Sequence, residues 1–230
     1  GCSRTSNDIR IDITHHQEVR NLLNKINPDI IINTVGLIDL DFCENNPFQT
    51  WNVNSNSIYN ICEWIKKKNK KIIYISTDQF FAYSKKKKNN EEDPISLVNV
   101  YAQTKFLGEL FVGKSRNHLI VRTNIIGLSQ KKSFAEWVIK CIENRVQMDL
   151  FDDYKISSID IYKFSELLFN SIEKDLTGTF NLGSREVFSK KEIIFEFSKQ
   201  MGIQLYKPNV QKSKFKTIRS QNCGLDVSKI

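Results

Sequence analysis

Tyr101 and Lys105, four positions apart, are the residues of this sequence whose types and spacing point most directly to chemistry. On a helix, residues i and i+4 lie on one face, which would bring the lysine ammonium close to the tyrosine phenol. A neighbouring positive charge favours the phenolate, so it lowers the phenol pKa from its ordinary value of about 10. Such a tyrosine can exchange a proton with a carbonyl or an alcohol near neutral pH. The spacing alone is common by chance, and most pairs of this kind are surface contacts.

A second group of polar residues, Ser76, Thr77 and Asp78, follows the apolar run 71–75, which we expect to be a buried strand. A hydroxyl at the end of this strand can hydrogen-bond the reacting oxygen and hold it against the phenol. The same residues also suit an ordinary polar loop after a strand. Considered together with the tyrosine, the lysine and the alternating elements around them, they favour the catalytic interpretation.

Short apolar strands alternate with amphipathic helices along the first half of the chain, and this alternation predicts an α/β fold with a doubly wound parallel sheet. Right-handed crossovers place the carboxyl ends of the strands, and hence a ligand crevice, on one side. After Asn124 the pattern is less regular and predicts a small C-terminal lobe, with one or two elements returning to the main sheet. We expect strands at 9–13, 29–33, 71–75, 118–122 and 178–182, and helices at about 14–27, 46–65, 101–112, 134–143, 159–172 and 189–201.

Two of these helices have clear start signals. Thr14 is expected to cap the first helix, and Asn46 followed by Pro47 opens the second with proline at its first position. The helical period of the second helix predicts a core face of Phe48, Trp51, Ser55, Ile58, Cys62 and Ile65.

Composition excludes several classes of protein. The chain has 230 residues, a net charge of +8 and no apolar run close to the roughly 20 residues that span a bilayer. With no signal-peptide pattern at its start, it is expected to be a soluble cytoplasmic protein without a membrane partner. Its lysines gather at 66–71 and 85–88 without the aromatics or arginines that read bases, so solvated surfaces are favoured over nucleic-acid binding. Five scattered cysteines without a C-x-x-C pair, and three histidines, argue against structural disulfides and a metal site.

Further segments match the motifs of one enzyme family. Residues 75–78 and 99–105 correspond to its catalytic strand end and catalytic helix. Other matching segments are 12–13, 28–33, 34–36, 41–44, Asn54 with Asn60, 121–123, 178–183 and 224–229. On these residues the chain resembles the extended short-chain dehydrogenase/reductase family, and within it the dTDP-4-dehydrorhamnose reductase branch, also called the sugar-nucleotide-binding reductases.

The resemblance implies hydride transfer from NADP(H), with NAD(H) as an alternative, to the C4 ketone of a nucleotide-linked deoxysugar, as in dTDP-rhamnose biosynthesis. Tyr101 would protonate the oxygen, Lys105 would lower the Tyr101 pKa and hold the nicotinamide ribose, and Thr77 would bind the same oxygen. The implied cofactor-binding residues are Asp12, Ile13, Asn33, Thr34, Val35, Gly36, Asn54, Tyr101 and Lys105. The implied substrate-binding residues are Thr77, Asp78, Gln79 and Asn124. For Asn33 and Asn54, backbone capping is an equally good interpretation.

The family's glycine-rich phosphate turn has no counterpart here, because no glycine lies between Gly1 and Gly36. We therefore expect an N-terminal truncation, with roughly 50 residues, more than one βαβ unit, preceding this chain. Residues 1–123 would form a partial dinucleotide-binding Rossmann core with the catalytic helix. Residues 124–230 would form mainly the substrate-binding lobe, with some elements returning to the core. Without the phosphate turn, the chain alone can be inactive.

Three segments depart from the family pattern where the sugar should lie: 79–83, Asn124 with Ile125, and Ser157 with Ser158. The sugar therefore stays open, and a related nucleotide-sugar epimerase or reductase is an alternative. A different class is a non-catalytic regulatory subunit resembling the beta subunit of methionine adenosyltransferase, which acts by binding a partner enzyme. The expected partner in the enzymatic interpretation is a nucleotide-sugar substrate, with a homodimer as an open alternative.

Overall fold

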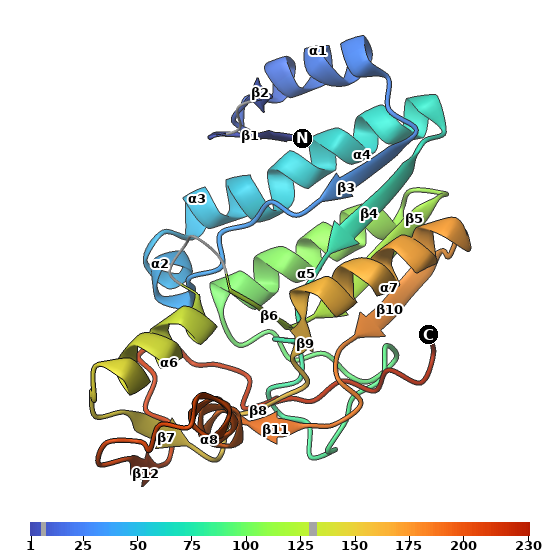
Figure 1. The fold of residues 1–230 in the computed structure, drawn as a ribbon. Helices are drawn as coiled ribbons and strands as arrows, with labels where there is room; N and C mark the ends of the chain where they lie inside the picture. Colours follow the sequence, from blue (N-terminus) through green and yellow to red (C-terminus); the bar gives the residue numbers. More distant parts are fainter. Residues whose placement is uncertain (6–7, 129–132) are drawn as a thin grey trace. The chain divides into compact units, whose positions relative to one another are not determined.

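A four-stranded sheet carries the candidate residues in the computed structural model, which describes residues 1–5, 8–128 and 133–230 (Figure 1). Its strands, in the order β10-β5-β4-β3, are Gly178–Leu182, His118–Thr123, Lys71–Ile75 and Ile30–Asn33. β3 pairs with β4, and β4 with β5, in parallel register, with Ile31 opposite Ile72 and Ile72 opposite His118. β-Branched residues dominate these strands because they pack well on a pleated, buried surface. The parallel sheet expected from the alternation is confirmed.

The chain divides into two compact units. Unit 1 comprises Gly1–Thr77, Leu97–Val121 and Leu176–Thr179. Unit 2 comprises Asp78–Ser96, Arg122–Asp175 and Phe180–Ile230. The neighbours Thr77 and Asp78 therefore belong to different units, and the boundaries also fall within β5 and β10.

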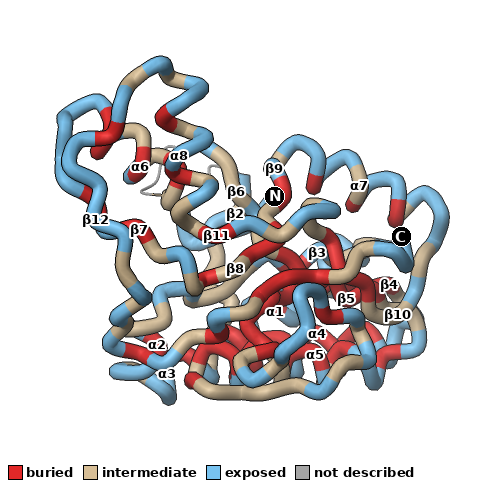
Figure 2. The backbone as a smooth tube through the Cα atoms, turned by 90° about the horizontal axis from the view of Figure 1, so that it is seen from below, coloured by how far each residue is buried: buried red, intermediate tan, exposed pale blue. Residues whose placement is uncertain are grey.

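The helices of unit 1 are α1 (His16–Ile26), α2 (Leu40–Asn45), α3 (Pro47–Trp51), α4 (Ser57–Lys68) and α5 (Val100–Gly113), with a π-helical turn at Asn52–Asn56. α1 packs on α4, and α4 packs on α5 and β4. Figure 2 shows that β4 and β5 consist mostly of buried residues. The core cluster of this unit is built from Val19, Ile58, Ile61, Cys62, Trp64, Ile65, Ile72, Tyr74, Val112 and Ile120.

The second predicted helix is present, and Pro47 occupies its first turn, but only four of the six residues of its expected core face, Ser55, Ile58, Cys62 and Ile65, are buried. The other two, Phe48 and Trp51, are 76% and 38% exposed. The π-helical turn at Asn52–Asn56 explains the difference. An extra residue in one turn rotates the preceding residues by about 100° relative to the following ones, so a constant helical period fails across it.

The first predicted strand and helix are shorter than expected. The strand is only β2 (Ile9–Arg10), paired in parallel with β1 (Cys2–Ser3). The prediction that Thr14 caps α1 is wrong, because α1 begins at His16 and no side chain caps it. Instead, Thr14 donates its N–H and its hydroxyl to Asp12 Oδ1, at 2.9 Å and 2.7 Å. This local turn competes with capping for the same hydroxyl.

Unit 2 contains α6 (Phe134–Glu143), α7 (Ile161–Glu173) and α8 (Lys190–Met201). Ser189 caps α8, in a capping box in which Glu192 reaches back to the Ser189 N–H. Short strands complete the unit: β6 (Ile125–Ile126), β7 (Asp149–Phe151), β8 (Lys155–Ile156), β9 (Ile159–Asp160), β11 (Phe188–Ser189), β12 (Asn209–Gln211) and β13 (Asn222–Cys223). They form three small sheets, β11-β8-β13, β12-β7 and β6-β9.

The two lysine runs are mostly exposed, at Lys66, Lys67 and Lys68 and throughout 85–88, although Lys71 within β4 is buried. Of the helices in the described ranges, none is both long and apolar enough to cross a membrane.

Candidate active site

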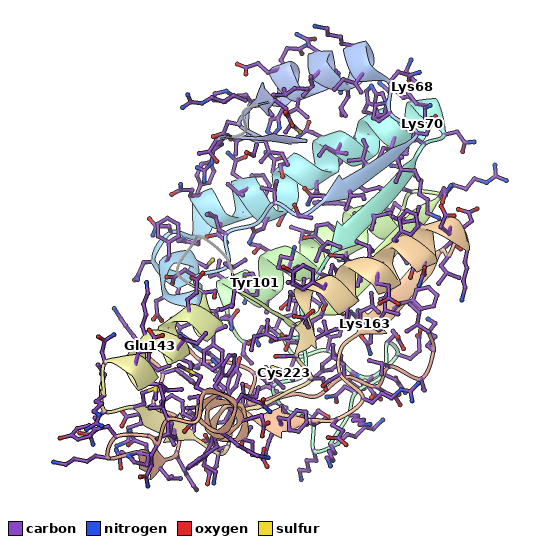
Figure 3. All side chains as sticks on the ribbon, viewed as in Figure 1. Lys68, Lys70, Tyr101, Glu143, Lys163 and Cys223 are labelled. Carbon is purple, nitrogen blue, oxygen red and sulfur yellow. The ribbon has the colours of Figure 1, made fainter. Side chains whose placement is uncertain are left out.

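Helix α5 positions the tyrosine and the lysine of the predicted pair. The helix starts after Asn99, whose Oδ1 accepts the Ala102 N–H at 2.8 Å, so the N-terminus is fixed one residue before Tyr101. Figure 3 shows Tyr101 on this helix. Tyr101 is 8% and Lys105 4% exposed, so both lie one turn apart on a buried face. The pair is therefore not a surface contact.

The direct contacts of the Lys105 ammonium are uncharged groups. Nζ donates a hydrogen bond to the Ile75 carbonyl at 2.7 Å and lies 4.1 Å from the centroid of the Tyr74 ring. Burial lowers the pKa of Lys105 to about 7, against a smaller raising effect of the Glu109 charge. Near neutral pH the ammonium and the amine are therefore balanced, and an anionic ligand would favour the ammonium.

Asn54 ties the loop after β3 to α5. Its Nδ2 donates to the Leu37 carbonyl at 3.0 Å, and its Oδ1 accepts the Leu37 N–H at 2.8 Å. Nδ2 also donates to Thr104 Oγ1 at 3.2 Å. A Cβ at Gly36 would lie 3.5 Å from Asn54 Oδ1 and 4.0 Å from Lys105 Nζ. The structure thus brings together Gly36, Asn54 and Lys105, and Asn54 fixes the backbone beside the lysine.

Asn33 ends β3 at the carboxyl edge of the sheet. The side chain is 4% exposed, yet its Nδ2 has no hydrogen-bond partner within the part of the chain that the structure describes. A buried donor of this kind is uncommon unless a ligand or water accepts from it. The neighbouring Thr34 is exposed, and Val35 is half-buried. Asn33 therefore offers an unused donor to a ligand at this edge of the sheet.

Asp12 and Ile13 have local roles. Asp12 accepts both bonds from Thr14, and these bonds lower its pKa. Ile13 packs against the core cluster of unit 1. Among the hydrogen bonds and ion pairs of the described residues, none joins Asp12 or Ile13 to Gly36, Asn54 or Lys105, so their assignment to the cofactor stays a prediction.

Thr77 lies directly after β4 and is 4% exposed. The preceding Ser76 donates its N–H to the Val121 carbonyl at 2.7 Å, which continues the pairing of β4 with β5 beyond the strand itself. Because the backbone is held in this way, both hydroxyl-bearing residues are fixed at the carboxyl edge of the sheet. The expected polar strand end is present.

Unit 2 joins the three other predicted substrate residues in one hydrogen-bonded network. Asn124 Nδ2 donates to Asp78 Oδ2 at 2.7 Å, and Gln79 Nε2 donates to Asp78 Oδ1 at 3.2 Å. Ser158 Oγ donates to Asn124 Oδ1 at 2.7 Å. Gln79 also donates to the Tyr154 hydroxyl at 2.9 Å. Two positions that depart from the family pattern, Asn124 and Ser158, therefore contact each other directly.

A cavity of about 140 Å³ lies beside this network within unit 2. Sequence reasoning named Asn124 among its lining residues, but it missed Tyr154 and Lys190. Lys190 is the first residue of α8, and a lysine at the start of a helix is ordinarily a surface residue. Tyr154 stands in a polar stretch. No sequence signal identifies either residue, because the cavity depends on contacts between distant segments.

The sequence of the chain matches a known protein family. Residues 2–230 match the family described as the RmlD substrate binding domain. A dTDP-4-dehydrorhamnose reductase of Sinorhizobium fredii is 24% identical over 184 residues, 76% of this chain. The chain spans 62% of the length of that relative.

Solved structures share the fold. A dTDP-4-dehydrorhamnose reductase from Bacillus anthracis str. Ames, in complex with NADP, superposes with a TM-score of 0.89 at 20% identity, over 95% of this chain and 79% of that one. The Bordetella bronchiseptica enzyme WbmG, in complex with NAD and UDP, gives a TM-score of 0.84 at 17% identity, over 98% and 73%. These likenesses confirm the predicted Rossmann-like fold.

Proposed function

The chain belongs to the RmlD substrate binding domain family, and from that membership we propose that the full protein is an NADP(H)-dependent reductase of a nucleotide-linked 4-keto-deoxysugar. The named relative supports this reaction, and the Bacillus anthracis structure, described with NADP, supports the cofactor. The WbmG structure, described with NAD and UDP, makes NAD(H) the alternative cofactor and supports a nucleotide-sugar ligand.

The observation that carries this proposal is the environment of Lys105. An ammonium bonded to a backbone carbonyl, one helical turn after a buried tyrosine, supports the proposal that Lys105 adjusts the ionisation of Tyr101. Gly36 leaves space beside Nζ, and Asn33 holds an unused amide donor at the same edge of the sheet. We assign these residues, with Thr34, Val35 and Asn54, to the nicotinamide half of the cofactor, and Asp12 and Ile13 to its adenosine half.

Reduction needs a hydride and a proton, and the hydride is what the reduced nicotinamide supplies when bound. Tyr101 gives its phenolic proton to the C4 oxygen as negative charge develops there. The Thr77 hydroxyl holds the same oxygen and limits its position. Lys105, when charged, stabilises the phenolate that Tyr101 becomes and contacts the nicotinamide ribose. Asp78, Gln79 and Asn124 contact the sugar.

We further propose that residues 1–123 form the partial dinucleotide-binding core and 124–230 mainly the substrate lobe. The hydrogen-bonded network of Asp78, Asn124 and Ser158 supports a sugar site whose polar groups differ from the family pattern. The reduced sugar therefore need not be rhamnose.

The test is turnover by the full-length protein with NADPH and a dTDP-4-keto-deoxysugar, followed by the absorbance of the reduced cofactor. Tyr101→Phe is expected to lower kcat by ~10²–10⁴-fold, because it removes the proton donor. NADPH affinity should stay within about threefold. Tyr59→Phe is the matched control, since Tyr59 is 43% exposed on α4 and its ring contact with Phe111 survives the change. Unchanged turnover in Tyr101→Phe would refute the catalytic assignment.

A further inference from the structure

The cavity of unit 2 contains the cationic side chain of Lys190. Its residues come from four separate segments: Asn124, Ile125, Ile126, Gly127, Ser133, Phe134, Ala135, Tyr154, Ile156, Ser158 and Lys190. At about 140 Å³ it is smaller than the roughly 300–1,000 Å³ of pockets that enclose whole small molecules. It therefore fits one group of a larger ligand.

Aromatic rings line the Lys190 ammonium. Nζ lies 5.0 Å from the centroid of Phe134 and 4.7 Å from that of Tyr154. Ring faces attract a cation, but less strongly than a carboxylate does. Within residues 1–5, 8–128 and 133–230, Lys190 has neither an ion pair nor a hydrogen bond from its side chain.

The charge of Asp78, and to a smaller extent Cys223, raises the pKa of Lys190, but neutral amides bind the Asp78 carboxylate. Asn124 donates to Oδ2 at 2.7 Å, and Gln79 donates to Oδ1 at 3.2 Å. The carboxylate is therefore held in the network and does not reach the ammonium. Of the described residues that line the cavity with Lys190, none is acidic.

Holding the cation there is costly. Burial, and to a smaller extent the Arg219 charge, lower the pKa of Lys190. A partly dehydrated charge without a counter-charge is unfavourable, and an anion entering the cavity would offset that cost. Asn124 Nδ2 carries a second hydrogen besides the one given to Asp78, so a neutral donor is also available to such an anion.

We propose that Lys190 is a substrate-binding residue that recognises an anionic oxygen of the nucleotide sugar in this cavity. The class of ligand rests on the proposed function, whereas the preference for an anion rests on the cavity itself. Two parts of a sugar nucleotide carry this chemistry, the diphosphate and the carboxylate of an acidic sugar. A cavity of this size holds either group.

The experiment measures dissociation constants by isothermal titration calorimetry on the full-length protein. The probes are dTDP, UDP, UDP-glucose and UDP-glucuronate. Lys190→Met is expected to weaken binding at least tenfold, and Lys190→Arg to retain it within about threefold. Lys199→Met is the matched control, because Lys199 is on the same helix and its side chain is 78% exposed. NADPH affinity should stay unchanged in all three variants.

The pattern of losses identifies the anion. Weaker binding of dTDP and UDP supports recognition of the diphosphate, and a loss confined to UDP-glucuronate supports recognition of a carboxylate. Equal affinities of wild type and Lys190→Met for every probe overturn the inference, and so does a wild type that binds none of them at millimolar concentration. Lys190→Gln repeats the comparison if the methionine variant unfolds early. Reductase turnover is scored separately, so a protein that binds anions through Lys190 without reducing any 4-keto sugar refutes only the proposed function.

Discussion

Replacement of Lys105 by methionine tests the environment of this lysine directly. The side chain is 4% exposed, and burial lowers its pKa from 10.5 to about 7. Below pH 7 the lysine is charged in both the folded and the unfolded chain, and above 10.5 it is neutral in both. Between these values the unfolded chain keeps a proton that the folded protein has released. The free energy of unfolding of the wild type therefore rises with pH across this window.

The size of the effect follows from the pKa difference. A difference of about 3.5, at about 1.4 kcal/mol for each pKa unit, corresponds to about 5 kcal/mol over the whole window. Between pH 7 and pH 9 the gain is about 2 kcal/mol, because the lysine is still half charged at pH 7. Lys105→Met lacks this gain. Loss of the hydrogen bond to Ile75 adds a constant cost of about 1–3 kcal/mol, which shifts the curve without changing its slope.

The assay is urea unfolding at several pH values between 7 and 9, followed by tryptophan fluorescence, since Trp64 is 4% exposed and reports on the core. A reductant is needed because all five cysteines are free. Lys68→Met, at the exposed end of α4 (Figure 3), corrects for the general loss of one positive charge. A difference between wild type and Lys105→Met that is the same at both ends of this range would refute the lowered pKa.

Two further substitutions test packing and capping by thermal or urea unfolding. Gly108→Ala should cost about 1–3 kcal/mol, because its Cβ would overlap the Tyr74 hydroxyl oxygen and lie 2.8 Å from Tyr74 Cζ. Adding Tyr74→Phe to Gly108→Ala should recover part of the lost free energy of unfolding. If it recovers none, the Tyr74 hydroxyl is not the cause of the destabilisation. Ser189→Ala should cost about 0.5–2 kcal/mol at pH 7, because α8 loses its cap. The cost should shrink on acidification, since Ser189 lowers the pKa of Glu192 and this stabilising contact is lost as the carboxylate is protonated.

Elements with strong local signals could be predicted closely. The helix expected at 134–143 is α6, which a capping serine starts, and the strand expected at 178–182 is β10, in which Phe180 and Leu182 are buried. The errors arise where a local alternative intervenes. Asp12 takes the hydroxyl of Thr14 that was expected to cap α1, and the π-helical turn breaks the period of the second helix. Asp12 two residues before Thr14 is a pattern that suits either a turn or a helix start, and the π turn has no sequence pattern distinct from that of a helix.

In the candidate site, too, local spacing could be predicted from the sequence, whereas contacts between distant segments could not. Tyr101 and Lys105 follow from helical spacing, so their position on one buried face of α5 was predictable. The hydrogen bonds of Asn54 to Leu37 were not predictable, because they join positions 17 apart in sequence through the π-helical turn. Lys190 was missed for the same reason. Its aromatic neighbour Tyr154 comes from another segment, and only the folded chain brings them together.

Lys105 and Lys190 differ from the lysines that give this chain its net charge of +8. Most of those lysines are exposed, where water solvates the charge and an added anion gains little. Lys105 is held by a carbonyl and a ring face, and Lys190 by two ring faces, so neither cation has a carboxylate partner among the described residues. Burial lowers the pKa of both, and an anion would raise it again. Lys105 in unit 1 and the half-buried Lys190 in unit 2 therefore each carry a charge that an anionic ligand would favour, which agrees with the two anionic ligands of the proposed function.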